Sequence, residues 1–396
     1  MSDQLVSGSL PQAKDGEAAA SPRRRLGRVV SVQTTSERGG AEYANVDLLD
    51  ALARRGHDVV LLTNVPELAE GTEVRVREID LGPKLARRSV LAVLVRVPLY
   101  LVRLARALRA ERPAGVVLLH FKKEQLLCSL LPRRLAPSIV WAEWGPVPPA
   151  MRSGPARWLY ALAARRVQRV FAVSEGTRRT VVAAGVAAAK VEVIPNLVDV
   201  HDVHFDPDAR ERLRSQWGAG ENTLVVGCIS RFQKRKRNDV VIDAMAHLDG
   251  DALLVLAGEG EQESALRERA EPYGERVKFA PNVRGYVEEF LSACDLLVFA
   301  PSPTEGEPRV IVMAQLVGVP VVATHPEGAE GLIPAGAGTI VSPAHDPVAL
   351  AGVLAAYRDD RERCRSEGAS ARRVTLVTHE PERTLGAVER ALDPLA

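Results

Sequence analysis

The sequence contains few of the features that mark metal-binding, disulfide-bonded or membrane-spanning proteins. Only four of its 396 residues are cysteines, and these lie far apart, with no CxxC pair and no Cys/His cluster: Cys128, Cys228, Cys294 and Cys364. This spacing predicts free thiols in a reducing cytosol and no structural zinc. No apolar stretch of transmembrane length is free of interrupting charges, so we expect a cytoplasmic protein.

Aromatic residues and net charge are also scarce. Aromatic side chains make up 4% of the chain and the formal net charge is only +2, so no overall field favours nucleic acid as a partner. The apolar content of 46% is typical of a globular protein, and 396 residues suffice for two domains of ordinary size. Residues 1–25 are polar, lack the apolar core of a signal peptide and are predicted to form a disordered tail.

Short apolar runs alternate with helical spacing along most of the remaining chain. The runs predicted to be strands in the first half are residues 26–32, 58–63, 74–81, 115–119, 138–143, 169–174 and 190–195. This alternation predicts a doubly wound α/β domain over residues 26–200. Residues 201–221 are polar and are expected to connect two domains. From Leu224 the pattern begins again, which predicts a second domain of the same class over residues 222–396.

The second domain is organised around residues 295–324, DLLVFAPSPTEGEPRVIVMAQLVGVPVVAT. An apolar strand over 296–300 leads into a loop that carries Glu305, followed by a helix over 309–317 and a further buried strand. Ligands of parallel sheets bind at the carboxyl ends of strands, where this loop lies. An ordinary crossover with a solvated glutamate is the alternative.

A glycine pair, Gly39 and Gly40, precedes the helix predicted over residues 41–55. Glycines at this point let the backbone approach an anion at the helix N-terminus. The pair is not a GxGxxG motif, and no acidic residue ends the next strand, which disfavours a nicotinamide cofactor. A bare turn is the commoner use of such a pair.

Further polar groups follow two strands of the first half. His120 leaves the strand over 115–119 and is well placed for a site, although a lone histidine is more often structural. Glu143 and Trp144 leave the strand over 138–143. Because a tryptophan can pack on a sugar ring while a carboxylate accepts its hydroxyls, these two residues are candidate acceptor contacts.

Two basic stretches remain. Residues 84–112 are predicted to be helical, with arginines set among Leu and Val and with Pro98 kinking or splitting the helix. A crossover helix with snorkelling arginines is favoured, and a weak association with an anionic membrane surface is the alternative. The run Arg231–Arg237 lies between a strand and a helix, where cations suit a diphosphate; a solvated charge run is the alternative.

Several segments occur in the order found in one enzyme family. The succession GGAE, RRGHDVVLLT, VSEGTRR, VIPNLVD, ISRFQKRK, LAGEGEQE, TEGEP and GVPVVAT, between about residues 28 and 358, resembles a retaining glycosyltransferase of family four (group 1). The resemblance implies the GT-B fold, in which two Rossmann-like doubly wound domains face each other across a cleft. It also implies a hexosyltransferase-type enzyme that moves a sugar from a nucleotide-sugar donor to an acceptor hydroxyl with retention of anomeric configuration.

The resemblance implies roles for particular residues. Arg231 and Lys236 match an Arg-x4-Lys pair that neutralises the donor diphosphate, His120 matches a histidine near the transferring sugar, and Glu305 matches the first glutamate of a Glu-x7-Glu motif. The implied donor-binding positions are Gly39, Gly40, Gly306, Glu307, Met313 and, as a weaker correspondence, Glu330. The donor is a substrate, and the family requires no cofactor or metal ligand because cationic side chains neutralise the diphosphate.

The chain departs from the family pattern in the same loop and helix. Counted from Glu305, or registered on the later Gly-x-Pro, the second glutamate of the motif is replaced by Met313. Glu307 and Pro308 replace the usual aromatic residue and glycine, and Pro308 removes a backbone donor. Glu307 with Gln315 forms an alternative pair that is out of register.

Several functions remain open from the sequence. Within the fold, the alternatives to glycosyl transfer are a pseudo-glycosyltransferase and a nucleotide-sugar epimerase; a non-catalytic glycosyltransferase-like partner is a third, which Met313 keeps open. The expected partners are a nucleotide-sugar and a small-molecule, glycan or lipid-linked acceptor, with no nucleic acid. The expected location is the cytoplasm, with the inner membrane face as the peripheral alternative.

Overall fold

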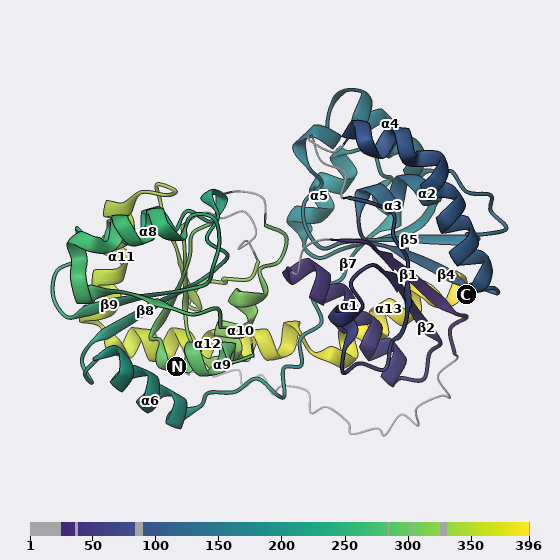
Figure 1. Ribbon diagram of the computed structural model, residues 1–396. Helices are drawn as coiled ribbons and strands as arrows, with labels where there is room; N and C mark the ends of the chain where they lie inside the picture. Colours follow the sequence, from purple (N-terminus) through teal and green to yellow (C-terminus); the bar gives the residue numbers. More distant parts are fainter. Residues whose placement is uncertain are drawn as a thin grey trace, which may run out of the picture.

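Two parallel β-sheets, one in each half of the chain, form the centres of two domains in the computed structural model (Figure 1). The structure describes residues 25–35, 39–83, 90–283, 285–302, 305–324 and 331–395, and within them the side chains of residues 90–94 are excepted. Among the helices of these residues, none is long and apolar enough to cross a membrane.

The first sheet has seven strands in the order β3-β2-β1-β4-β5-β6-β7, and every neighbouring pair is parallel. Its strands are β1 (Val29–Gln33), β2 (Val59–Thr63), β3 (Arg75–Glu78), β4 (Val116–Leu119), β5 (Ser138–Glu143), β6 (Val167–Ala172) and β7 (Val191–Val193). The central strands are buried on both faces, which explains why their sequences are continuous apolar runs without alternation.

Helices cover both faces of this sheet. One face carries α2 (Val90–Ala110), α3 (Lys122–Ser129), α4 (Gly154–Ala164) and α5 (Glu175–Ala183), which share a core with Val30 and Val32. The other face packs on α1 (Gly40–Arg54) and on α13 (Pro381–Leu392), which reaches this sheet from the far end of the chain. Adjacent strand residues alternate between the two cores, as the pleat of a strand requires.

The second sheet has six parallel strands in the order β10-β9-β8-β11-β12-β13. They are β8 (Leu224–Ile229), β9 (Ala252–Ala257), β10 (Val277–Ala280), β11 (Leu296–Phe299), β12 (Val321–Ala323) and β13 (Gly338–Ile340). The helices of this half are α6 (Pro207–Trp217), α7 (Asn238–Ala244), α8 (Glu263–Ala270), α9 (Val287–Ala293), α10 (Arg309–Val317), α11 (Pro347–Asp359) and α12 (Arg361–Thr378). Both sheets are therefore doubly wound, and the predicted α/β class is confirmed.

The chain crosses between the domains twice. The first crossing follows β7, and the second lies between α12, which packs on α10, and α13, which packs on the first sheet (Figure 1). Residues 201–221, expected from the sequence to be a connection, contain α6. This helix is capped by Asp206, has Pro207 in its first turn, and packs on α9 of the second domain.

Candidate functional site

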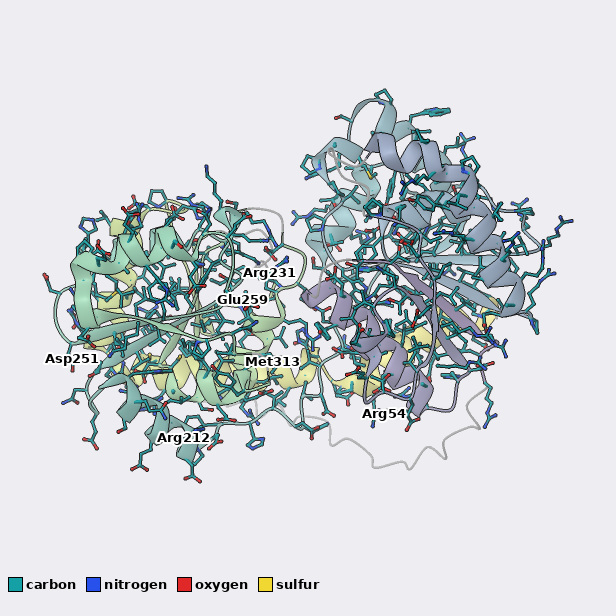
Figure 2. The ribbon with its side chains drawn as sticks, in the orientation of Figure 1. Arg54, Arg212, Arg231, Asp251, Glu259 and Met313 are labelled. Atoms are coloured by element: carbon teal, nitrogen blue, oxygen red, sulfur yellow. The ribbon has the colours of Figure 1, made fainter. Side chains whose placement is uncertain are left out.

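A cleft of about 810 Å³ lies between the two domains, at the carboxyl ends of their strands. The first domain lines it with the N-terminus of α1 and with Phe121, Trp144 and Asn196, which follow β4, β5 and β7. The second domain lines it with the segments that follow β8, β9, β10 and β11. Figure 2 shows Arg231 and Glu259 on the side of the second domain that faces the first. A cleft of this size and position is typical of a small-molecule site.

The loop after β8 supplies three cations to this cleft, Arg231, Arg235 and Lys236. Lys236 Nζ lies 2.8 Å from Glu305 Oε1, and Arg235 also pairs with this carboxylate. Burial opposes ionisation of Glu305, but the two ion pairs outweigh it and hold its pKa below the usual value. Glu305 is therefore ionised at neutral pH, and the structure brings together two residues, Lys236 and Glu305, that are far apart in the sequence.

The surroundings favour the charged form of Glu305 but disfavour the charged form of Lys236. Its burial, reinforced by the nearby charges of Arg235 and Arg231, lowers its pKa, and the carboxylate of Glu305 offsets only part of this effect. A buried cation among other cations has a strong electrostatic preference for an anion. The arrangement can thus hold a polyanionic group such as a diphosphate beside the carboxylate of Glu305.

The N-terminus of α1 faces the same cleft. Gly39 has extended backbone (φ −119°), so its backbone conformation does not require glycine. A Cβ built on Gly39 would lie 2.8 Å from Glu42 Oε2 and 3.9 Å from Arg231 Nη2, while no described heavy atom lies within 4 Å of a Cβ on Gly40. Glu42 itself accepts the Gly39 N–H at 3.1 Å. The helix terminus is therefore open toward the cleft at Gly40 and capped by the chain's own carboxylate at Gly39.

The loop that carries Glu305 also contacts the first domain. Gly306 lies so close to the first domain that a Cβ on it would be 2.6 Å from the Trp144 carbonyl oxygen and 2.7 Å from Gly145 Cα. Ser174, the N-cap of α5, donates its hydroxyl to the Gly306 carbonyl at 3.0 Å. Only glycine fits this contact, so Gly306 is explained by domain packing as it stands in the structure.

Glu307 contacts the two segments that connect the domains. Its carboxylate accepts the backbone N–H of Asn196, its carbonyl accepts the Asn196 side-chain amide at 2.9 Å, and Oε1 lies 3.4 Å from His379 Nε2. Asn196 belongs to the first crossing and His379 to the second. The carboxylate of Glu307 is thus engaged between the domains, whereas the carboxylate of Glu305 is engaged with cleft cations.

Helix α10 carries the position where the family pattern has a second glutamate. Arg309 and Val310 line the cleft, and Met313, one turn further, is half-buried among apolar residues (Figure 2). Gln315 is buried and bonds to the Leu332 carbonyl and to the Thr375 hydroxyl, so it joins α10 to α12. Glu330 lies outside the described residues.

The polar candidates of the first domain are arranged differently. Glu143 is buried and accepts bonds from Gln125 at 2.9 Å and Tyr160 at 2.8 Å, and it pairs with Lys122. These partners occupy its oxygens inside the domain, and Glu143 does not line the cleft. Its neighbour Trp144 is 9% exposed and does line it.

His120 is also largely enclosed by protein. It is 7% exposed, and its ring packs against Phe121 with the centroids 4.1 Å apart. Among the first-domain candidates, Trp144 therefore lines the cleft, whereas Glu143 and His120 do not. Of the sequence candidates, Gly39, Gly40, Trp144, Arg231, Lys236, Glu305, Gly306 and Glu307 line the interdomain cleft.

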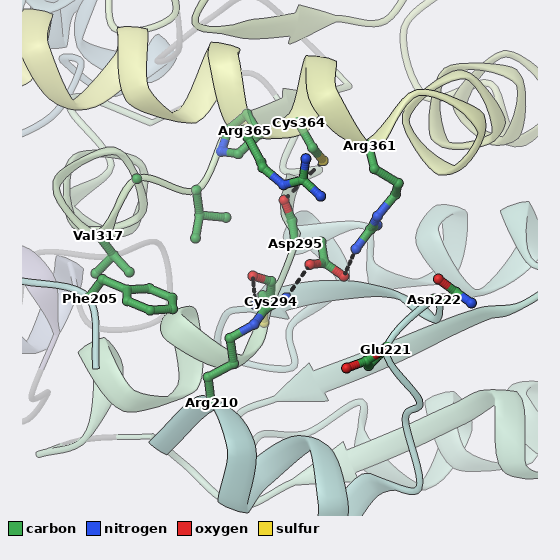
Figure 3. Close-up of a pocket in the computed structure, with 13 residues that line it drawn as sticks. Phe205, Arg210, Glu221, Asn222, Cys294, Asp295, Val317, Arg361, Cys364 and Arg365 are labelled. Carbon is green, nitrogen blue, oxygen red and sulfur yellow. Dashed lines mark hydrogen bonds and ion pairs between the residues drawn. The ribbon is translucent and has the colours of Figure 1, made fainter. Parts of the chain in front are cut away.

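A second hollow, of about 350 Å³, lies at the opposite edge of the second sheet (Figure 3). Asp295 is at its centre, directly before β11, and pairs with Arg210, Arg214 and Arg361. Although burial opposes it, this set of arginines lowers the pKa of Asp295. Asp295 also accepts the backbone N–H of Val225, so the cluster joins α6 and α12 to the start of the sheet.

Two family models match consecutive parts of the chain. The model described as Glycosyltransferase Family 4 matches residues 38–202, and the model described as Glycosyl transferases group 1 matches residues 209–374. The chain belongs to the group 1, family 4 glycosyltransferases. The first matched segment contains the strands of the first sheet except β1, and the second contains the second sheet, so the cleft lies between the two matched segments.

Curated relatives resemble part of this chain. A GDP-mannose-dependent alpha-(1-6)-phosphatidylinositol monomannoside mannosyltransferase of Mycolicibacterium smegmatis is 36% identical over 185 residues, which are 43% of this chain and 47% of the relative. A D-inositol 3-phosphate glycosyltransferase of Xylanimonas cellulosilytica is 32% identical over 188 residues, 44% of this chain and 45% of the relative. The chain thus spans about half the length of the curated relatives it matches.

Solved structures match this chain over most of its length. The Anabaena protein HepE in complex with UDP and glucose has a TM-score of 0.78 at 22% identity, covering 92% of this chain and 99% of that one. Sucrose-phosphate synthase of Thermosynechococcus elongatus has a TM-score of 0.78 at 18% identity, covering 94% of this chain and all of the other. These likenesses concern the fold, and with them the predicted GT-B architecture is confirmed.

The structure adds cleft residues that sequence reasoning did not select. Glu259 lines the cleft and accepts the Asn282 side-chain amide at 2.9 Å, and Asn282 lines it too. Arg309 and Asn196 are further examples, whereas Arg235 belongs to the basic run that the sequence singled out as a whole. The sequence signal for Glu259 was the pair of glycines on either side of it, directly after a buried strand. Both glycines have φ 152°, and a Cβ on either would meet the backbone near Phe232.

Proposed function

We propose that this glycosyltransferase moves a sugar from a nucleotide-sugar to an acceptor hydroxyl with retention of anomeric configuration. The observation that carries this is the combination of Arg231, Arg235 and Lys236 with Glu305 in the interdomain cleft. Because Lys236 Nζ and Glu305 Oε1 are 2.8 Å apart, a donor whose diphosphate contacts Lys236 places the adjacent sugar hydroxyls at Glu305.

The chemical work of the cleft is electrostatic. Arg231 and Lys236 stabilise the negative charge that develops on the departing diphosphate, and such stabilisation supplies the greatest part of the rate enhancement in many enzymes. The acceptor hydroxyl attacks on the face from which the diphosphate leaves, while an oxocarbenium-like sugar forms between them. The proton of that hydroxyl passes to the leaving phosphate oxygen. The close contact of Gly306 with the first domain excludes water and limits hydrolysis of the donor.

The names of the relatives support the donor and acceptor classes. Mannosyltransferases that are named for GDP-mannose and a neighbour in complex with UDP both use a nucleoside diphosphate as the anionic part of the ligand. The relatives' names include a phosphatidylinositol mannoside and an inositol phosphate. We therefore propose a small-molecule, glycan or lipid-linked acceptor, with neither a metal nor a further cofactor in the reaction.

A panel of nucleotide-sugars tests this function. The thermal midpoint and nucleotide release are measured with each donor, because a ligand that binds the native state raises the midpoint by mass action. The expected result is stabilisation by one nucleotide-sugar and release of its nucleotide when acceptor is present. Lys236→Ala is the matched control and should lose both effects. A panel in which no nucleotide-sugar or nucleoside diphosphate changes the midpoint overturns the donor-site assignment.

A second candidate is a non-catalytic member of the fold. Met313 favours it, because a thioether cannot replace the carboxylate that normally holds the nucleotide ribose. This candidate predicts a midpoint that is insensitive to nucleoside diphosphates. The pseudo-glycosyltransferase and epimerase alternatives predict binding as well, and are separated from glycosyl transfer by the product: a non-glycosidic bond for one, an epimerised nucleotide-sugar for the other.

A further inference from the structure

Charge is distributed very unevenly along this nearly neutral chain. Residues 84–170 contain seventeen Lys and Arg but only three acidic residues, although the whole chain has a net charge of +2. All three acids are buried: Glu111 is 1% exposed, Glu124 is 0% exposed and Glu143 is 3% exposed. The described surface of this stretch therefore carries positive charge without a carboxylate of its own to balance it.

Exposed apolar side chains gather in the same stretch. More than half of the strongly exposed large apolar residues in the described chain lie there: Val95, Leu99, Val102, Leu130, Trp158, Leu159 and Leu162. Val95 is 81% exposed and Trp158 is 63% exposed. The six others among the described residues are spread over five separate segments, with at most two on one helix, so the gathering here is not an average property of the surface.

The exposed residues of α2 form one stripe. Val95, Leu99 and Val102 follow the i, i+4, i+7 spacing that places side chains on a single face of a helix. The opposite face of α2 is buried through Tyr100 and Leu104 against the first sheet. The predicted crossover helix is thus present, but it carries a second apolar face that no described element covers.

The exposed apolar residues of α2 and α4 lie on the outward side of the same helix layer. Both helices bury their inner residues in the same core on one face of the first sheet, and α3 lies between them in contact with both (Figure 1). We call the outward side of this layer the α2–α4 face. The exposed arginines of these helices and of the segments that directly follow them are Arg96, Arg103, Arg106, Arg109, Arg112, Arg133, Arg134, Arg157 and Arg165. Arg103 is paired with Asp80 at the margin.

The first turns of α2 and α4 lie at the same edge of the first sheet as the cleft. Helices α2 and α4 follow strands of a parallel sheet, so their first turns start at the carboxyl edge, where the cleft lies. Val95 and Leu99 lie in the first half of α2, and Trp158 and Leu159 in the first half of α4. These four residues are thus in the halves of the helices nearer to the cleft, whereas Val102 and Leu162 lie in the other halves.

We propose that the α2–α4 face docks on the surface of an anionic lipid bilayer. Apolar residues flanked by arginines suit the boundary between lipid headgroups and acyl chains, where each basic residue also gains from the negative surface potential. A polyanion such as nucleic acid offers phosphates but no apolar layer for Val95, Leu99 or Trp158. Docking would set the mouth of the cleft close to the bilayer, and it is independent of whether sugar transfer takes place.

Vesicle binding by the full chain tests this inference. We expect flotation with vesicles of phosphatidylcholine mixed with phosphatidylglycerol and much weaker flotation with phosphatidylcholine alone. Binding should fall as salt is raised, because screening weakens surface electrostatics. Val95→Ser together with Trp158→Ser should weaken partitioning on the order of tenfold or more. Arg106→Gln together with Arg109→Gln should weaken it roughly tenfold at low salt.

The matched control is Val374→Ser with Val377→Ser on α12, where the two valines are 39% and 65% exposed. This variant should bind vesicles like the parent protein. Absence of binding to the anionic vesicles at low salt, equal binding by the Val95/Trp158 variant, or equal weakening in the control overturns the docking face. Tighter binding to an oligonucleotide that survives Val95→Ser/Trp158→Ser overturns the lipid surface in favour of a polyanion.

Discussion

Two Lys–Glu pairs occupy matching places in the two domains and are used in opposite ways. Glu143 ends β5 in the first domain and pairs with Lys122, while Glu305 follows β11 in the second and pairs with Lys236. The lysine side chains are similarly enclosed, at 16% and 14% exposed. Burial lowers the pKa of both lysines. Depth in the protein therefore does not distinguish the two lysines, although the side chain of Glu143 is 4% exposed and that of Glu305 is 16% exposed.

The remaining neighbours of each carboxylate make the difference. Glu143 also accepts bonds from Gln125 and Tyr160, so neutral donors inside the domain complete its coordination. Burial, followed by the charge of Glu143, raises the pKa of Tyr160 and keeps it protonated as a donor. Among the described residues, the side-chain partners of Glu305 are the cations Arg235 and Lys236, and both line the cleft with it. A carboxylate at a strand end is thus structural or available to ligand according to what surrounds it.

The largest expected effect separates the two lysines. Lys236→Ala should reduce turnover on the order of a hundredfold, because it removes a charge that stabilises the leaving diphosphate. Lys122→Ala should instead destabilise the protein by about 3 kcal/mol, because Glu143 is left buried without its cation. Turnover, nucleoside diphosphate affinity and thermal midpoint are measured for both variants. If the lysines fail to separate in this way, the contrast between the pairs is wrong.

The next comparison is between the two carboxylates of one loop. Glu305→Ala should weaken use of the donor roughly ten- to a hundredfold, the value of hydrogen bonds to a charged group. Glu307→Ala should chiefly lower the thermal midpoint, since it leaves the buried N–H of Asn196 without its acceptor. Steady-state kinetics over donor concentration and thermal unfolding check the ranking. A larger kinetic loss in Glu307→Ala would mean that Glu307 is the ligand-binding carboxylate, and Glu307→Gln serves as its conservative control.

Met313→Glu tests whether the second domain lacks a ribose contact. Met313 lies one turn beyond the cleft-lining Arg309 and Val310, so a carboxylate at this position should reach the ribose hydroxyls. We expect about tenfold tighter binding of free nucleoside diphosphate with unchanged sugar preference. Titration calorimetry of parent and variant decides it, with Val348→Glu at an exposed site on α11 as the control. Unchanged or weaker binding would refute the ribose-face position of Met313.

The smallest effect concerns pH. The pKa of Lys236 lies below the usual 10.5 because of burial, so its charge is lost at lower pH than that of an exposed lysine. The pKa of Glu305 is lowered, so its carboxylate stays ionised until the solution is acidic. Its titration therefore does not contribute to changes in affinity at alkaline pH. Nucleoside diphosphate affinity should therefore weaken as pH rises toward 10.5. Lys236→Arg should flatten this dependence, because arginine stays protonated; an unchanged slope would contradict the assignment.

The sequence by itself determined the double α/β architecture and the order of its parts. Strand β5 and helix α10 were predicted with the bounds that the structure has, and β5 was recognisable because a strand buried on both faces needs a continuous apolar run. The motifs in the sequence also indicated the family that the two family models match. The sequence pattern failed where elements are short or polar. Strand β13 has three residues, and α6 buries little besides Ala209 and Arg214.

Only the tertiary structure decided which partner each polar residue takes. Glu305 and Glu307 are two positions apart, yet one pairs with Lys236 in the cleft and the other contacts Asn196 and His379 at the domain crossings. Gln315, an alternative ribose contact from the sequence, is bonded to Thr375 instead. Ion pairs and hydrogen bonds depend on separations of a few ångströms between residues far apart in the chain. No local pattern carries that information, whereas the apolar periodicity that builds strands and helices is local by nature.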